Sequence, residues 1–214
     1  MIDFDLEEMV QQQLVSRGVH DQRVIAAFRE VPRAAFVPQY LHNRMYGDER
    51  LPIGLGQTIS PPYLSARMLQ SLQLKSDARV LEVGTGSGYQ TAMLSRLAGE
   101  VLTIECLPEL SARARKLLVD DMHLDNVTFL VGDGYQGWSD RAPFDAIIVN
   151  AAAEEIPWPL EGQLRTRGRL VMPVGEREQR LVVLHRPKAS AEPSECDSEP
   201  ITNLFPMLEG EAQE

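Results

Sequence analysis

The chain has 214 residues, of which 43% are hydrophobic and 24% are charged, as is typical of one globular domain with its own core. Its formal net charge of −10 argues against nucleic acid or an anionic membrane surface as a partner, because both attract a basic face. No apolar run is long enough to cross a bilayer, and the acidic start MIDFDLEEMV lacks the basic region of a secretory signal. We therefore predict a cytoplasmic protein, and we take it to be a monomer.

Cysteine and histidine give no sign of a metal site. Cys106 and Cys196 lie far apart and form no CxxC pair, and the four histidines lack the spacing of metal ligands. We predict two free thiols and no bound metal.

Residues 1–75 are predicted to form a mostly helical N-terminal segment. Apolar residues recur at helical spacing over Leu6–Leu14 and again over Val24–Val31, where Pro32 stops the pattern. Residues 40–62, which include LPIGLGQTISPP, are rich in glycine and proline and predict a loop.

A further helix is predicted directly after this loop. Ser60 followed by Pro61 is typical of an N-cap and a first helical position. Apolar residues then continue at helical spacing to Leu72.

Residues 76–185 alternate between predicted strands and helices, which indicates parallel strands with right-handed crossovers. The strands are expected at Ala78–Val83, Val101–Glu105, Val127–Val131, Phe144–Val149, Arg169–Pro173 and Arg180–Leu184. The helices are expected at Tyr89–Ala98, Pro108–Val119 and near Leu160–Leu164.

The C-terminal part is harder to assign. Residues 186–199 are polar and are interpreted as a loop or hairpin connection, Ile201–Leu208 as a last strand, and residues 209–214 as a frayed tail. We treat residues 1–214 as one domain, in which 1–75 covers a core at 76–185 and 186–214 completes it.

The segment Glu82–Gly88, EVGTGSG, carries the first functional signal. Glycines between a strand and a helix allow a tight turn and a close approach of a nucleotide-like ligand. A dinucleotide turn reads GxGxxG, but here Tyr89 stands at the third glycine position. An acidic residue before the turn instead suits S-adenosylmethionine, which has a positive amino group and sulfonium and no pyrophosphate.

Two later carboxylates support the same ligand. Glu105 ends the second strand of the core, where a carboxylate can accept hydrogen bonds from both ribose hydroxyls. Asp133 lies between two glycines after the third strand and can reach an adenine amino group, although Asp-Gly is also a common turn. The residues predicted to bind the cofactor are Glu82, Gly84, Thr85, Gly86, Gly88, Glu105, Asp133 and Gly134.

Several ordered blocks together resemble one family, the protein-L-isoaspartate O-methyltransferases. The blocks are GQTIS at Gly56–Ser60, VLEVGTGSGYQTA at Val80–Ala92, GDGYQGW at Gly132–Trp138, APFDAIIVNAA at Ala142–Ala152 and GRLVMPVG at Gly168–Gly175. The resemblance implies a three-layer Rossmann-like α/β fold with a mostly parallel seven-stranded sheet whose C-terminal edge is atypical. It also implies methylation of the α-carboxylate of isoaspartyl residues in damaged proteins or peptides, which begins repair and leaves S-adenosyl-L-homocysteine.

The same resemblance implies roles for residues outside the glycine turn. The serine that closes GQTIS is the active-site residue of the family, which is Ser60 here, and the predicted substrate-binding residues are Gln57, Thr58, Ile59 and Asn150. The chain departs from the family at Pro61 and Asn150, where glutamine and threonine are common, and also in its C-terminal tail.

These departures keep two other functions open. A carboxyl methyltransferase acting on a dedicated peptide or small acid would keep the chemistry and change the substrate. A noncatalytic S-adenosylmethionine-binding module would keep only the cofactor, although the intact GQTIS loop argues against it.

Overall fold

The computed structural model describes residues 4–188, 195–201 and 205. The α-helices of this part of the chain are α1 (Phe4–Met9), α2 (Gln22–Glu30), α3 (Pro62–Leu72), α4 (Tyr89–Leu97), α5 (Pro108–Arg115) and α6 (Trp158–Gln163). Shorter π- and 3-10-helical turns lie at Val10–Leu14, Val15–Arg17, Arg33–Phe36, Gln39–Arg44, Lys116–Asp121, Gly134–Gln136 and Ser139–Arg141. Of the helices within the described residues, none has the length and apolar character needed to span a membrane.

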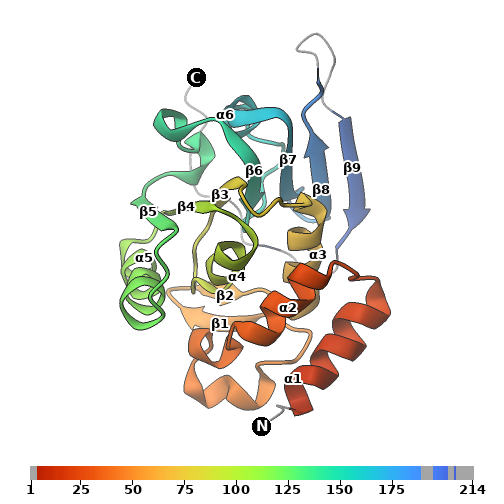
Figure 1. The fold of residues 1–214 in the computed structure, drawn as a ribbon, viewed down its shortest axis with the longest axis vertical. Helices are drawn as coiled ribbons and strands as arrows, with labels where there is room; N and C mark the ends of the chain where they lie inside the picture. Colours follow the sequence, from red (N-terminus) through yellow and green to blue (C-terminus); the bar gives the residue numbers. More distant parts are fainter. Residues whose placement is uncertain (1–3, 189–194, 202–204, 206–214) are drawn as a thin grey trace.

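The strands form a small hairpin and a large sheet (Figure 1). Their bounds are β1 (Leu51–Gly54), β2 (Gln57–Ile59), β3 (Arg79–Val83), β4 (Glu100–Glu105), β5 (Val127–Val131), β6 (Phe144–Val149), β7 (Leu164–Val174), β8 (Arg180–His185) and β9 (Glu195–Pro200). Within the described residues the large sheet has the order β5-β4-β3-β6-β7-β8-β9. Neighbours from β5 to β7 are parallel, and β8 and β9 add antiparallel pairs. The predicted fold class, with its atypical C-terminal edge, is confirmed.

Side chains alternate between the two faces of the sheet, so successive residues of one strand enter different cores. Val80 and Ile148 belong to the larger core, which α1–α5 complete, whereas Leu81 and Ile147 belong to a smaller core beneath α6. The central strands are therefore buried on both faces, which explains their near-continuous apolar sequences.

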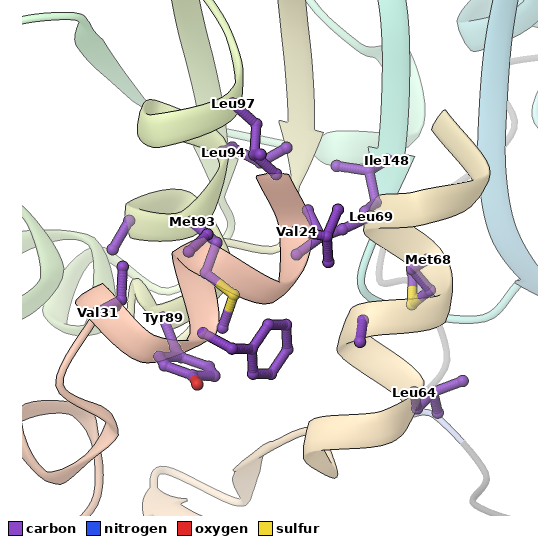
Figure 2. Close-up of a cluster of buried hydrophobic side chains, with 14 of the residues drawn as sticks. Val24, Val31, Leu64, Met68, Leu69, Tyr89, Met93, Leu94, Leu97 and Ile148 are labelled. Atoms are coloured by element: carbon purple, nitrogen blue, oxygen red, sulfur yellow. The ribbon is translucent and has the colours of Figure 1, made fainter. Parts of the chain in front are cut away.

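Helix α2 fastens the N-terminal segment to the rest of the protein. Its N-cap is Asp21, whose carboxylate accepts the amides of Arg23 and Val24, as expected of a helix start. Figure 2 shows α2, which carries Val24, between α4 with Leu94 and α3 with Leu69. The predicted helices at both ends of residues 1–75 are thus confirmed, and they pack on the larger core.

Three predictions need correction. Residues 40–62 are not all loop, because Leu51 pairs with Ile59 and Pro52 with Thr58 in the β1–β2 hairpin. Ser60 is not the N-cap of α3, because Pro61 holds that position. Part of the polar connection at 186–199 is a strand, since β9 pairs antiparallel with β8.

The predicted last strand at 201–208 falls mainly outside the described residues, and the predicted tail at 209–214 lies wholly outside them. Phe205, which is described, is anchored by Gln179. The side-chain amide of Gln179 donates to the carbonyl of Phe205 over 3.0 Å, and its oxygen accepts the amide of Phe205 at 2.5 Å. This reciprocal pair joins Phe205 to the turn before β8.

Candidate active site

A pocket opens at the carboxyl edge of the parallel strands, where the strand order reverses. β4 lies on one side of β3 and β6 on the other, and open α/β sheets bind ligands at such a switch point. The pocket holds about 870 Å3, including its open mouth, which suits a nucleoside-sized ligand. It is lined by Gln57, Thr58, Ile59, Ser60, Ser65, Val83, Gly84, Thr85, Gly86, Ser87, Tyr89, Gln90, Ile104, Glu105, Cys106, Leu110, Gly134, Asn150 and Ala151.

The backbone between β3 and α4 forms one wall of this pocket. It passes through left-handed conformations at Gly84 and Gly86, with φ of 89° and 55°, which glycine adopts without strain. The amide of Gly84 donates to the carbonyl of Ile104 over 2.8 Å, and a Cβ at residue 84 would lie 3.3 Å from the Cβ of Asn150. A ligand can therefore approach bare backbone here.

Glu105 supplies the charge of the pocket. It is the only charged residue among the described residues of the lining. Its carboxylate accepts the amide of Gly86 at 2.8 Å and the amide of Leu107 at 3.1 Å, which leaves lone pairs for ligand hydroxyl groups. Among the described lining residues there is one negative side chain and no positive one. This charge disfavours a pyrophosphate and fits a cationic nucleoside such as S-adenosylmethionine.

Glu82 lies behind the pocket rather than in its lining. Its carboxyl is fully buried and accepts hydrogen bonds from Thr91 (2.5 Å), Thr103 (2.8 Å) and Asn150 (3.0 Å). Burial raises its pKa to about 7, although these hydrogen bonds act in the opposite direction. The hydroxyl of Thr85, which lines the pocket, lies 2.6 Å from that of Thr103 and so joins the pocket to this network.

Asn150 connects the glycine turn to β6. Its side-chain amide donates to the carbonyl of Gly84 and to the carboxyl of Glu82, both over 3.0 Å. Its side-chain oxygen accepts from Gln90 over 3.1 Å. All the polar atoms of this side chain are therefore engaged, and residue 150 braces the pocket wall as well as lining it.

Two other predicted cofactor residues do not line the pocket. Gly88 has a φ of 86° and is the N-cap residue of α4, and a Cβ there would lie 3.0 Å from Leu118. Asp133 is exposed and accepts the amide of Tyr135 over 2.8 Å, whereas its neighbour Gly134 does line the pocket. In the structure Gly88 thus serves helix packing, and Asp133 caps a short turn.

The segment between the β1–β2 hairpin and α3 forms the opposite wall. Its residues Gln57, Thr58, Ile59 and Ser60 all line the pocket. The hydroxyl of Thr58 accepts from Arg50 over 3.3 Å. The predicted substrate loop and the predicted cofactor turn therefore face one pocket, although they are more than twenty residues apart in sequence.

Ser60 differs from its neighbours in how it is held. Its backbone carbonyl accepts a hydrogen bond from Arg33 over 2.7 Å. Its hydroxyl makes no hydrogen bond to any of the described residues. The main chain of Ser60 is fixed, and its side-chain hydroxyl is available to a ligand.

Several lining residues escaped sequence reasoning. Ser87, Tyr89 and Gln90 follow the glycine turn directly, so an interpretation extended past Gly88 would have included them. Ser65 comes from α3 and Leu110 from α5, and both resemble ordinary helix residues in the sequence. Only the packing of these helices brings them to the pocket.

Comparisons with known proteins agree with this geometry. The family model described as protein-L-isoaspartate(D-aspartate) O-methyltransferase matches residues 5–200. A Picosynechococcus protein-L-isoaspartate O-methyltransferase is 49% identical over 186 residues, which is 87% of this chain and 83% of the relative.

Two solved structures are similar over nearly the whole chain. One is a protein-L-isoaspartate O-methyltransferase with a TM-score of 0.83 and 27% identity, which covers 96% of this chain; the chain spans 66% of that larger protein. The other, from Plasmodium falciparum, is described as a protein-L-isoaspartate O-methyltransferase in complex with S-adenosyl-L-homocysteine. It has a TM-score of 0.77 and 25% identity, and the match covers 95% of this chain and 97% of that one.

Proposed function

The chain belongs to the protein-L-isoaspartate(D-aspartate) O-methyltransferase family, and we propose that Ser60 positions the substrate carboxylate while Glu105 holds the cofactor. The enzyme methylates isoaspartyl residues with S-adenosylmethionine and thereby starts the repair of damaged proteins. When bound, this cofactor supplies an electrophilic methyl group on a sulfonium sulfur. The residues of the chain must bind it, orient the acceptor and exclude water.

The cofactor-binding part of the proposal rests on the turn between β3 and α4 and on Glu105 at the end of β4. Glu105 would accept hydrogen bonds from the ribose hydroxyls, while Gly84, Gly86 and Gly134 would let the backbone lie against the ligand. Thr85, which lies between Gly84 and Gly86, would line the cofactor site in the same turn. The observation in support is that Glu105 is the only charge among the described lining residues.

Glu82, Gly88 and Asp133 would then act indirectly. Glu82 supports Asn150 and the glycine turn through hydrogen bonds, and Gly88 lets α4 pack closely on its neighbours. We infer that substitution of Glu82 changes cofactor affinity through the shape of the turn, whereas substitution of Gly88 acts mainly on helix packing. A direct adenine contact by Asp133 stays a prediction.

The catalytic part of the proposal depends on Ser60. A carboxylate is already ionised at neutral pH, so the site needs no strong base, only an acceptor oxygen held in line with the methyl group. The free hydroxyl of Ser60 would donate to one carboxylate oxygen and orient the other. Gln57, Thr58, Ile59 and Asn150 would shape the acceptor subsite and exclude water from it.

Paired peptides that differ only in Asp versus isoAsp test this function. With labelled S-adenosylmethionine, the wild-type protein should label only the isoaspartyl peptide. Ser60→Ala should lower kcat by about 10- to 100-fold, because a lost orienting contact misplaces the acceptor. The Kd for S-adenosyl-L-homocysteine should change less than about twofold, because the cofactor contacts lie on the other wall.

Ser71→Ala is a matched control, since Ser71 lies on α3 outside this pocket. It should retain wild-type turnover. Equal labelling of both peptides would favour a general carboxyl methyltransferase, and tight cofactor binding without labelling would favour a noncatalytic module. Unchanged turnover of Ser60→Ala would refute the role of Ser60.

We further propose that the enzyme works as a monomer in the cytoplasm, on protein and peptide substrates rather than nucleic acids or membranes. Cys106 and Cys196 are exposed, and neither forms a disulfide within the described part of the chain, which fits a reducing compartment. The net charge of −10 opposes binding to polyanions. Light scattering after size exclusion and fractionation of cells test the two parts separately.

A further inference from the structure

Arg33 is a buried arginine close to the substrate wall that no sequence motif indicates. It follows α2, in the short turn Arg33–Phe36, and its exposed fraction is 1%. Its Nε donates to the carbonyl of Met45 over 2.6 Å, and its Nη2 donates to the carbonyl of Ser60 over 2.7 Å. One guanidinium thus joins two loops that are fifteen residues apart in sequence.

The charge of Arg33 has no carboxylate partner in the described part of the chain. Burial lowers its pKa from the usual arginine value, and its Nη1 finds no hydrogen-bond partner there. Burying an unpaired charge costs free energy, and an apolar side chain of similar size would avoid that cost. The position therefore calls for a role beyond packing.

Tyr89 connects this arginine to the cofactor side of the pocket. The guanidinium carbon of Arg33 lies 4.7 Å from the centre of the Tyr89 ring, a distance typical of a cation–π contact. Tyr89 begins α4 directly after the glycine turn and lines the pocket. Its ring centre lies 6.1 Å from that of Phe28 on α2, and Figure 2 shows it beside this helix.

We propose that Arg33 is a positioning residue, which holds the main chain of Ser60 at a fixed place relative to the helix that follows the cofactor turn. Its planar fork donates to two carbonyls while its guanidinium carbon lies over the Tyr89 ring, and lysine cannot reproduce that geometry. The same cation contacts the main chain of Ser60, so its positive charge favours an anionic substrate at the acceptor site. This inference rests on the proposed role of Ser60.

Hydrogen exchange of the cofactor-free protein tests the anchoring directly. Arg33→Met keeps the apolar volume and removes both hydrogen bonds. Within residues 57–63, the amides of Gln57–Ser60 and Tyr63 should therefore exchange about tenfold faster or more, the effect of losing a charge-assisted bond. Arg23→Met is the matched control, because Arg23 also bridges two carbonyls, those of Leu74 and Leu97, but away from the pocket. It should leave exchange at residues 57–63 unchanged.

Arg33→Lys separates charge from geometry and guards against a misfolded methionine variant. It should restore less than half of the lost protection. Full protection in the lysine variant, or equal exchange of residues 57–63 in the Arg33→Met and Arg23→Met variants, would overturn the proposal.

Kinetics then test whether Arg33 acts through Ser60. Arg33→Met should lower kcat about tenfold on an isoaspartyl peptide with the Kd for S-adenosyl-L-homocysteine unchanged within twofold. In a Ser60→Ala background the same substitution should lower kcat less than twofold, because coupled residues are not additive. If Arg33→Met lowered kcat a further tenfold in the Ser60→Ala background, the two residues would act independently and the coupling would be refuted. Failure of the role of Ser60 itself would be seen in Ser60→Ala alone, independently of the exchange data.

Discussion

Glu105 and Glu82, the two carboxyl residues nearest the glycine turn, lie in different environments and therefore have different roles. Glu105 is engaged by backbone amides and faces the pocket, so it can bind a ligand. Glu82 is enclosed by hydroxyl and amide donors, and no cation is among its hydrogen-bond partners. Its charge must be supported by neutral dipoles alone, which do not compensate fully for lost hydration.

This difference predicts a pH dependence of stability. Because the folded-state pKa of Glu82 is raised from 4.5 to about 7, the folded protein keeps a proton that the unfolded chain releases in that window. Its contribution to stability is present at low pH and is lost as pH rises towards 7. The free energy of unfolding of Glu82→Gln, relative to that of the wild type, should increase by up to about 3 kcal/mol from pH 5 to pH 8. Urea unfolding across this range measures it.

Glu8→Gln serves as the control for a simple change of charge, since Glu8 is exposed on α1. Its stability difference from wild type should vary by less than about 0.5 kcal/mol over the same pH range. A flat difference for Glu82→Gln would mean that Glu82 is ionised in the folded protein at pH 5, contrary to the effect of its burial.

Residues that belong to a local pattern were predictable, and those that depend on distant contacts were not. Ser60 and Glu105 stand beside a loop motif and at a strand end, so the sequence indicated both, and the structure brings both to one pocket. Arg33 lies in a short apolar stretch, VPRAAFVP, where a charge is unusual. Its partners Met45 and Ser60 come from other segments, and nothing local identifies them.

At the scale of elements, burial on both faces made strands predictable. β6 has the predicted bounds, because a strand between two cores is apolar throughout. β5 also has the predicted bounds, although it is a partly buried edge strand. The β1–β2 hairpin was missed, since glycine and proline at its turn outweigh the few residues that pair. β9 reads ECDSEP and was taken for a connection, because pairing with β8 rather than apolar character makes it a strand.

The glycine turn permits a matched comparison between packing and binding. Alanine at residue 84 or 88 would be strained by positive φ, of 89° and 86°, and each variant should lose about 2 kcal/mol of stability. Only residue 84 lines the pocket. Gly84→Ala should therefore also weaken S-adenosyl-L-homocysteine binding, by about tenfold or more, whereas Gly88→Ala should change it less than about threefold.

Calorimetry of S-adenosyl-L-homocysteine binding and urea unfolding of the same samples measure the two effects separately. Equal loss of affinity in both variants would restore Gly88 to the cofactor-binding residues that the sequence predicted. It would also mean that the contact between Gly88 and Leu118 transmits strain to the turn.

At the scale of the whole molecule, the pocket is built from two parts of the chain. One wall comes from the parallel core and the other from the N-terminal segment, and α2 lies between α3 and α4, which belong to different walls (Figure 2). A ligand held between these walls binds the folded chain and has no such site in the unfolded one. Cofactor affinity must therefore appear as added stability of the whole protein.

S-adenosyl-L-homocysteine at about 100 times its Kd should stabilise the protein by about 2.7 kcal/mol, which raises Tm by roughly 5–10 °C for a chain of this size. Glu105→Gln removes the negative charge that would accept hydrogen bonds from the ribose, so it should weaken binding about tenfold. The shift in Tm at the same ligand concentration should then fall to roughly half. Glu109→Gln, on the exposed face of α5, should keep the full shift. Differential scanning calorimetry measures all three. A full shift in Glu105→Gln would show that Glu105, the one charged residue among the described lining residues, does not hold the cofactor, because the added stability depends only on affinity for the folded state.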